Sequence, residues 1–161
     1  MNVIHTPLLH RLISNHVDFV LVGGFAVRHY GCRQYIRDID LMINPNRLNA
    51  QRLIDALAAE GLAAQQHLEN LCKPDKKIEL PRPYEIDILT PPHEAEYDTF
   101  YRDSSIINVN STIVRVTSLP GIISLKTITV LRMERDFYAD KKELLKHKTD
   151  LDCLKKISAK L

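Results

Sequence analysis

The sequence has no long hydrophobic run and no start typical of a leader. No stretch reaches the roughly 18 consecutive apolar residues of a transmembrane helix, so we expect no membrane partner. The first seven residues, from Met1 to Pro7, lack the basic start and apolar stretch of a secretory signal. This absence predicts a cytoplasmic protein.

Cysteine is scarce, and the histidines follow no metal-binding spacing. The three cysteines, Cys32, Cys72 and Cys153, are an odd set, lie far apart and include no CxxC. Such a set is not typical of a disulfide framework or of a zinc site. The seven histidines form no HxH or HExxH pattern. We therefore expect neither a disulfide framework nor zinc.

Excess charge and aromatic residues are also lacking. The 22 basic and 20 acidic residues leave a formal net charge of +2, and aromatic residues make up 6% of the chain. Residues 126–161 hold ten basic and six acidic residues, for which a solvated helix face is a simpler explanation than a polyanionic partner. No basic stripe is interleaved with aromatic residues, which argues against a protein that only binds nucleic acid.

Internal repeats and glycine- or serine-rich linkers are absent as well. A length of 161 residues and an apolar share of 45% suit one folded domain. The sequence therefore predicts a single domain over residues 1–161, with a core at about 1–117 and a helical tail at about 118–161.

Hydrophobic periodicity predicts strands mixed with helices. Helical spacing is found over residues 5–15, 25–30 and 47–60. Short apolar or alternating runs predict strands over residues 18–22, 38–43, 76–80 and 84–89, and a hairpin of 106–109 with 112–116. Ser118 is expected to open a helix with Pro120 in its first turn. Residues 121–160 are expected to be helical, with a break near Thr149-Asp150.

A glycine pair, Gly23-Gly24, separates the strand at 18–22 from the helix that follows. Glycine lets the backbone turn sharply and lets a ligand approach the main chain. A helix N-terminus offers unpaired N–H groups and the positive end of a dipole, which suits a phosphate. A Gly-Gly pair alone is most often only a turn. The sequence lacks the Gly-Lys-Ser/Thr of a P-loop and the pattern GxGxxG.

Three aspartates are predicted to meet on two strands. Asp38 and Asp40 are two positions apart on the strand at 38–43 and share one face. At a separation of about 4 Å and a dielectric constant near 20, their carboxylates would repel by roughly 4 kcal/mol. Mg²⁺ or Mn²⁺ would relieve this repulsion, because hard cations take carboxylates together with substrate phosphates. Asp87, on the strand at 84–89, completes a triad if the two strands pair and is otherwise an exposed strand residue.

The sequence contains a second Asp-x-Asp, at Asp150-Leu151-Asp152. This pair lies in the predicted helical tail, where positions i and i+2 do not face each other. We therefore interpret it as surface charge or a helix cap.

Together, these features resemble the nucleotidyltransferase superfamily, which shares its palm-like fold with DNA polymerase beta. The pattern reads Val22-Gly23-Gly24, thirteen further residues, Asp38-Ile39-Asp40-Leu41 and then Asp87. The tail, from Thr117-Ser118-Leu119 to Arg135-Asp136 and Asp140, resembles that of small bacterial members. These members include the minimal and the abortive-infection antiphage nucleotidyltransferases. The resemblance implies an α/β (α+β) fold, a mixed β-sheet flanked by helices with a C-terminal helical tail.

The resemblance also implies an activity, the transfer of a nucleoside monophosphate from an NTP to an acceptor hydroxyl with release of pyrophosphate. ATP is the expected NTP, and Mg²⁺ (or Mn²⁺) is the expected cofactor. The residues implied as catalytic and metal-binding are Asp38, Asp40 and Asp87. Those implied as nucleotide-binding are Gly23, Gly24, Arg33 and Lys126. The acceptor would be a partner protein such as a toxin, a tRNA or a small molecule, and a homodimer is a further expected assembly.

One departure from the family pattern supports an alternative. Small members often carry Arg-x-Thr before the aspartate pair, whereas the matching positions here are Gln34 and Ile36. The threonine is absent, and the arginine is displaced to Arg33 or Arg37. The alternative is a catalytically weak or silent nucleotide-binding or antitoxin-like module of the same fold. Retention of all three carboxylates favours the active enzyme, because a silent protein has no need of a charged cluster.

Overall fold

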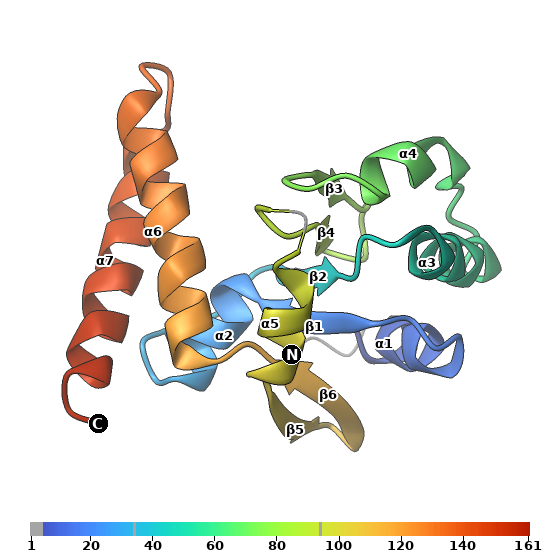
Figure 1. The fold of residues 1–161 in the computed structure, drawn as a ribbon, viewed down its shortest axis with the longest axis horizontal. Helices are drawn as coiled ribbons and strands as arrows, with labels where there is room; N and C mark the ends of the chain where they lie inside the picture. Colours follow the sequence, from blue (N-terminus) through green and yellow to red (C-terminus); the bar gives the residue numbers. More distant parts are fainter. Residues whose placement is uncertain (1–4, 34, 94) are drawn as a thin grey trace.

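Six strands form one mixed sheet in the order β3-β4-β2-β1-β6-β5 in the computed structural model, which describes residues 5–33, 35–93 and 95–161 (Figure 1). The strands are β1 (Phe19–Val22), β2 (Ile39–Ile43), β3 (Lys77–Glu79), β4 (Ile86–Leu89), β5 (Ser105–Val109) and β6 (Thr112–Val116). β1 lies antiparallel to β2 and parallel to β6, and β4 lies parallel to β2. The predicted α/β fold with a mixed sheet is confirmed.

Helices flank this sheet. They are α1 (His5–Ser14), α2 (Gly23–His29), α3 (Arg47–Ala59), α4 (Leu68–Leu71), α5 (Tyr97–Arg102), α6 (Leu119–Arg135) and α7 (Lys141–Ser158). A 3₁₀ turn, η1 (Gln65–His67), precedes α4. Figure 1 shows α6 and α7 side by side at one end of the molecule and α1 and α3 at the other. Among the described residues, no helix combines the length and the apolar character needed to cross a membrane.

The two faces of the sheet have different surroundings. On one face, Ile39, Leu41 and Ile43 of β2 are buried in the main core with leucines of α1 and α3. On the other face, Val22 and Met42 belong to a smaller cluster with aromatic residues of α5. Side chains alternate along a strand, and the carboxylate of β2 therefore lies on the second face, beside the smaller cluster.

The helical tail is confirmed, but its break is not where the sequence predicts. The two helices are separated by residues 136–140, and α7 continues through Thr149 and Asp150. Asp140 caps the N-terminus of α7, because its Oδ1 accepts the N–H groups of Lys142 at 2.7 Å and Glu143 at 3.1 Å. The break expected near Thr149-Asp150 is therefore wrong.

Candidate functional site

Asp40 and Asp87 are neighbours on the second face of the sheet. The parallel pairing of β2 with β4 sets the two residues directly opposite each other, so their side chains share a face. Burial raises the pKa of the Asp40 carboxyl, and the nearby charge of Asp87 raises it further. The charges of Lys77 and Lys126 and the N–H of Gly24 act in the opposite direction. The strand pairing that brings the two carboxylates together is confirmed.

Gly23 makes room for the Asp40 carboxylate. Its φ is +57°, in the left-handed region that favours glycine, and a Cβ at this position would lie 1.8 Å from Asp40 Oδ2. The backbone N–H of the next residue, Gly24, lowers the pKa of the same carboxyl. The first residues of α2, directly after β1, therefore lie against Asp40. The phosphate contact predicted for the two glycines stays a prediction.

Asp38 stands apart from this pair. β2 begins at Ile39, so Asp38 precedes the strand, and 46% of its side chain is exposed. Its Oδ1 lies 3.9 Å from Arg37 Nε. Within residues 5–33, 35–93 and 95–161, no three His, Cys, Asp or Glu side chains gather as metal ligands would. Of the three expected carboxylates, the structure brings together Asp40 and Asp87.

Lys77, on β3, faces the carboxylate pair and was not singled out from the sequence. Its Nζ lies 2.9 Å from Asp87 Oδ2 and 3.3 Å from Glu79 Oε1. Burial alone would lower the pKa of Lys77, but its hydrogen bond to Asp87 and the surrounding negative charges raise it overall. Lys77 is therefore a cation of the site, placed there by the antiparallel pairing of β3 with β4.

Lys126 reaches the site from α6 and is 5% exposed. Its Nζ lies 3.0 Å from Oδ2 of Asp150, a residue of α7 that is 4% exposed, and 2.9 Å from Nδ1 of His147. An ammonium group has three N–H donors, so these two contacts leave one donor. The interpretation of Asp150 as surface charge or a cap is wrong, whereas Asp152 is exposed as expected.

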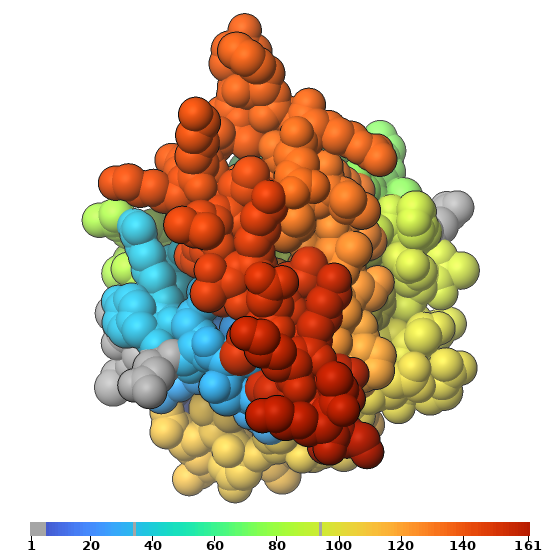
Figure 2. All heavy atoms as spheres, turned by 90° about the vertical axis from the view of Figure 1, so that its left-hand side faces the viewer, coloured from blue at the N-terminus to red at the C-terminus, as the bar shows by residue number. Residues whose placement is uncertain are grey.

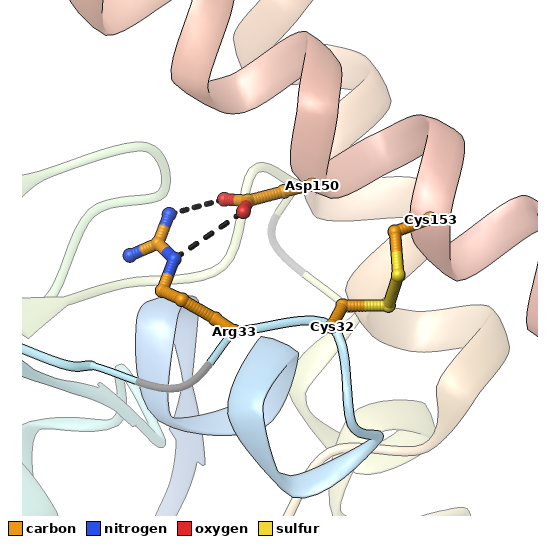
Figure 3. The surroundings of a disulfide bond; sticks show 4 residues. All are labelled: Cys32, Arg33, Asp150 and Cys153. Atoms are coloured by element: carbon orange, nitrogen blue, oxygen red, sulfur yellow. Dashed lines mark hydrogen bonds and ion pairs between the residues drawn. A yellow bond between two sulfur atoms is a disulfide. The ribbon is translucent and has the colours of Figure 1, made fainter.

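Arg33 binds the same carboxylate from the segment after α2. Its Nε donates to Asp150 Oδ1 at 3.3 Å, and its Nη2 pairs with Oδ2 (Figure 3). The guanidinium also lies against Gly24, where an added Cβ would be 2.9 Å from Nη1. Arg33 therefore connects α7 to the start of α2, where Asp40 is packed.

A disulfide joins Cys32 to Cys153 of α7, next to this ion pair (Figure 3). The sequence predicted no disulfide framework, but one disulfide forms, because folding brings together two residues 121 positions apart in the sequence. Figure 2 shows α7 lying against the segment that follows α2. Cys72 is free.

Burial also governs the bases of this network. It lowers the pKa of Lys126, although the neighbouring Asp150 carboxylate acts in the opposite direction. It lowers the pKa of His147 from 6.5 to about 4, helped by the positive charge of Lys126. His147 is therefore neutral at pH 7, and its Nδ1 can accept the hydrogen bond of the ammonium.

A cavity of about 400 Å³ lies over the second face of the sheet, within the size range of small-molecule sites. One part of its wall is apolar and comprises Val22, Met42, Leu89, Ile122, Leu125 and Ile128. The polar part includes Asp40, Lys76, Lys77, Lys126, Arg132 and His147. The cavity can therefore take a ligand that combines an apolar ring with negatively charged groups.

No family model matches the sequence, and no curated protein matches it. The structure is similar to that of an antigenic nucleotidyltransferase-like protein from Paracoccidioides brasiliensis, with a TM-score of 0.54 and 16% sequence identity. The similarity covers 94% of this chain and 73% of the other. The chain has a nucleotidyltransferase-like fold.

Within this nucleotidyltransferase-like fold, only some of the residues that the resemblance implied are gathered. Gly23, Asp40 and Lys126 line the cavity, and Asp87 lies beside Asp40. Arg33 is bound to Asp150 instead of lining the cavity. Gln34, where the family pattern departs, lies outside the described residues.

Proposed function

We propose that the protein transfers a nucleoside monophosphate from an NTP, with ATP the expected donor, to an acceptor hydroxyl and releases pyrophosphate. One observation carries the proposal: the Asp40–Asp87 pair lies beside a cavity that also holds Lys77 and Lys126. The apolar wall suits the base, and the cations suit the triphosphate. The nucleotidyltransferase-like fold supports the same conclusion.

Magnesium fits the carboxylate pair. Mg²⁺ is usually held by one or two protein carboxylates and completes its shell with water and substrate phosphates, and Asp40 and Asp87 are two adjacent carboxylates. The pKa of Asp40 is raised by burial and by the nearby charge of Asp87, although Lys77 and Lys126 act in the opposite direction. A bound divalent cation would compensate the remaining negative charge. With Mg²⁺ bound there, negative charge on the leaving pyrophosphate would be neutralised and the pKa of the acceptor hydroxyl lowered. Mn²⁺ would serve the same carboxylates.

The other residues would bind the NTP, hold one another in position and accept a proton. The remaining N–H of Lys126 would donate to a phosphate oxygen of the NTP. Asp150 and His147 would hold the ammonium in place for this contact. Asp87 would accept the proton of the acceptor hydroxyl. We propose Asp38 as an additional metal ligand. Its exposed position before β2 leaves its carboxylate accessible to solvent.

The acceptor is proposed to be a partner protein such as a toxin, a tRNA or a small molecule, by resemblance to small nucleotidyltransferases. A second candidate function is a nucleotide-binding or antitoxin-like module with little turnover. It is favoured by Arg33, which is tied to Asp150, and by Asp38, which stands outside the carboxylate pair. A homodimer or a toxin complex would suit this module equally.

The test is label transfer from each α-labelled NTP, with Mg²⁺ and then Mn²⁺, into a lysate of the source cell. Asp40→Asn and Asp87→Asn should each reduce transfer by at least about 100-fold, since each removes a group that acts in the transition state. Asp152→Asn, which alters an exposed carboxylate of α7, is the control and should leave transfer unchanged. Mg²⁺-dependent NTP binding without transfer would favour the silent module, and absence of both would refute a nucleotide site.

A further inference from the structure

We propose that the Cys32–Cys153 disulfide is a redox switch for this site, with the oxidised form binding NTP more tightly. The inference rests on the proposed function and adds its regulation. Both cysteines are partly exposed, so a small thiol reagent can reach the bond. A disulfide that small thiols can reach can be opened and closed by thiol–disulfide exchange.

The disulfide and an ion pair hold the same two segments together. Cys32 and Arg33 are adjacent in the segment after α2, and their partners Cys153 and Asp150 are three positions apart on α7 (Figure 3). Residues three apart on a helix lie on one face. The covalent bond therefore keeps Arg33 at the carboxylate of Asp150.

The disulfide and the Arg33–Asp150 ion pair together form a clamp. Two chains of contacts lead from this clamp to the nucleotide site. Through Asp150, the clamp reaches Lys126, which lines the cavity. Through Arg33, it reaches Gly24, against which the guanidinium lies. Gly24 follows Gly23, against which the Asp40 carboxylate is packed. A movement of the segment after α2 would therefore act on both a cation and a carboxylate of the site.

Opening the switch is an ordinary thiol–disulfide exchange. A thiolate of a dithiol reductant attacks one sulfur of the Cys32–Cys153 bond and forms a mixed disulfide, and the other cysteine leaves as a thiolate. The second thiolate of the reductant then attacks the reductant's own sulfur in the mixed disulfide. The reductant closes to a cyclic disulfide, and the remaining cysteine leaves as a thiolate. Two electrons pass to the protein, both cysteines end as thiols after taking up protons, and the reductant becomes a disulfide.

In the reduced form, the ion pair alone holds Arg33 at Asp150, because the covalent link between the two segments is lost. We expect ATP to bind roughly tenfold more weakly to the reduced form in the presence of Mg²⁺, a typical size for coupling between two sites. Amide hydrogen exchange should rise in α7 around Asp150 and in residues 35–38.

The experiment compares air-oxidised and dithiothreitol-reduced full-length protein. ATP binding with Mg²⁺ is measured by calorimetry, and hydrogen exchange by mass spectrometry. The double variant Cys32→Ser/Cys153→Ser should match the reduced wild type under both conditions. Cys72→Ser, which alters the free cysteine, should respond to the reductant as the wild type does.

Each outcome decides the proposal. Weaker ATP binding together with faster exchange, both upon reduction and in the double variant, supports the switch. Equal ATP affinity in the two forms overturns the switch and leaves the proposed function intact. If neither form binds ATP, the proposed function fails and the switch falls with it. In that case faster exchange upon reduction would still identify the disulfide as a structural clamp.

Discussion

At the scale of single residues, Gly23 is fixed by the carboxylate that it accommodates. Replacing it with alanine forces an L-residue into the left-handed region, at a cost of about 1 kcal/mol. The alanine also sets a Cβ 1.8 Å from Asp40 Oδ2, which adds about 1–3 kcal/mol of overpacking. Gly61→Ala is the matched control, because Gly61 has a φ of +81° and no atom within 4 Å of an added Cβ. Urea unfolding should therefore show a larger loss for Gly23→Ala, and equal losses would contradict the packing described here.

A comparison of substitutions at Asp150 and Asp152 shows how burial affects the stability contributed by two aspartates of one helix. Asp150→Asn leaves Lys126 and Arg33 without their shared carboxylate in a buried site. Removing one partner of a buried ion pair costs about 3–5 kcal/mol, and the free energy of unfolding should fall by about that amount. Asp152→Asn, on the exposed face, should change it by less than about 0.5 kcal/mol. Similar values for the two variants in denaturant titrations would argue against a buried network.

The lowered pKa of His147 predicts that the free energy of unfolding depends on pH. Its pKa is about 4 in the folded protein, against 6.5 as its ordinary value. The unfolded chain therefore binds a proton between these values that the folded chain excludes. Stability is retained above pH 6.5 and is lost as the pH falls toward 4, by about 3 kcal/mol. In His147→Gln this part of the loss should vanish, whereas the exposed His29→Gln should behave as the wild type in urea titrations at pH 7 and pH 4.5.

At the scale of elements, local patterns predicted most of the sheet. Alternation along residues 38–43 and 84–89 placed Asp40 and Asp87 on strands with the correct faces, because side-chain direction follows strand periodicity. The turn at Asn110-Ser111 joins β5 to β6 as expected, with positive φ at both residues. The short helices α4 and α5 were not predicted, because four to six residues are too few to show a helical period.

In the tail, the argument that positions i and i+2 of a helix do not face each other left open which of the two aspartates points inward. Asp150 lies four positions before Leu154, and both are buried on the inner face of α7. Helical spacing therefore contained a signal that Asp150 points inward. What spacing could not show was the partner, since Arg33 lies 117 positions away. Asp152 lies off the buried face of α7 and is exposed, as the sequence analysis expected.

At the scale of the whole molecule, the site depends on contacts that no local pattern contains. Lys77, Lys126 and His147 come from three elements that only the fold brings around one cavity. The disulfide is of the same kind, since its cysteines have no spacing that distinguishes them from Cys72. Sequence patterns thus predicted the strand carboxylates and the glycine turn, whereas the charged network around them required the tertiary structure.

The disulfide joins the segment after α2 to the last helix, so its effect on stability belongs to the whole chain. A cross-link across 121 residues removes chain entropy from the unfolded state worth about 4–5 kcal/mol at most. Cys32→Ser/Cys153→Ser should lower the free energy of unfolding by up to that amount and steepen its dependence on urea, because the unfolded chain expands further and exposes more surface. Cys72→Ser is the control for loss of a cysteine. A double variant as stable as the control would mean that the packing of α7, rather than the cross-link, holds the tail on the core.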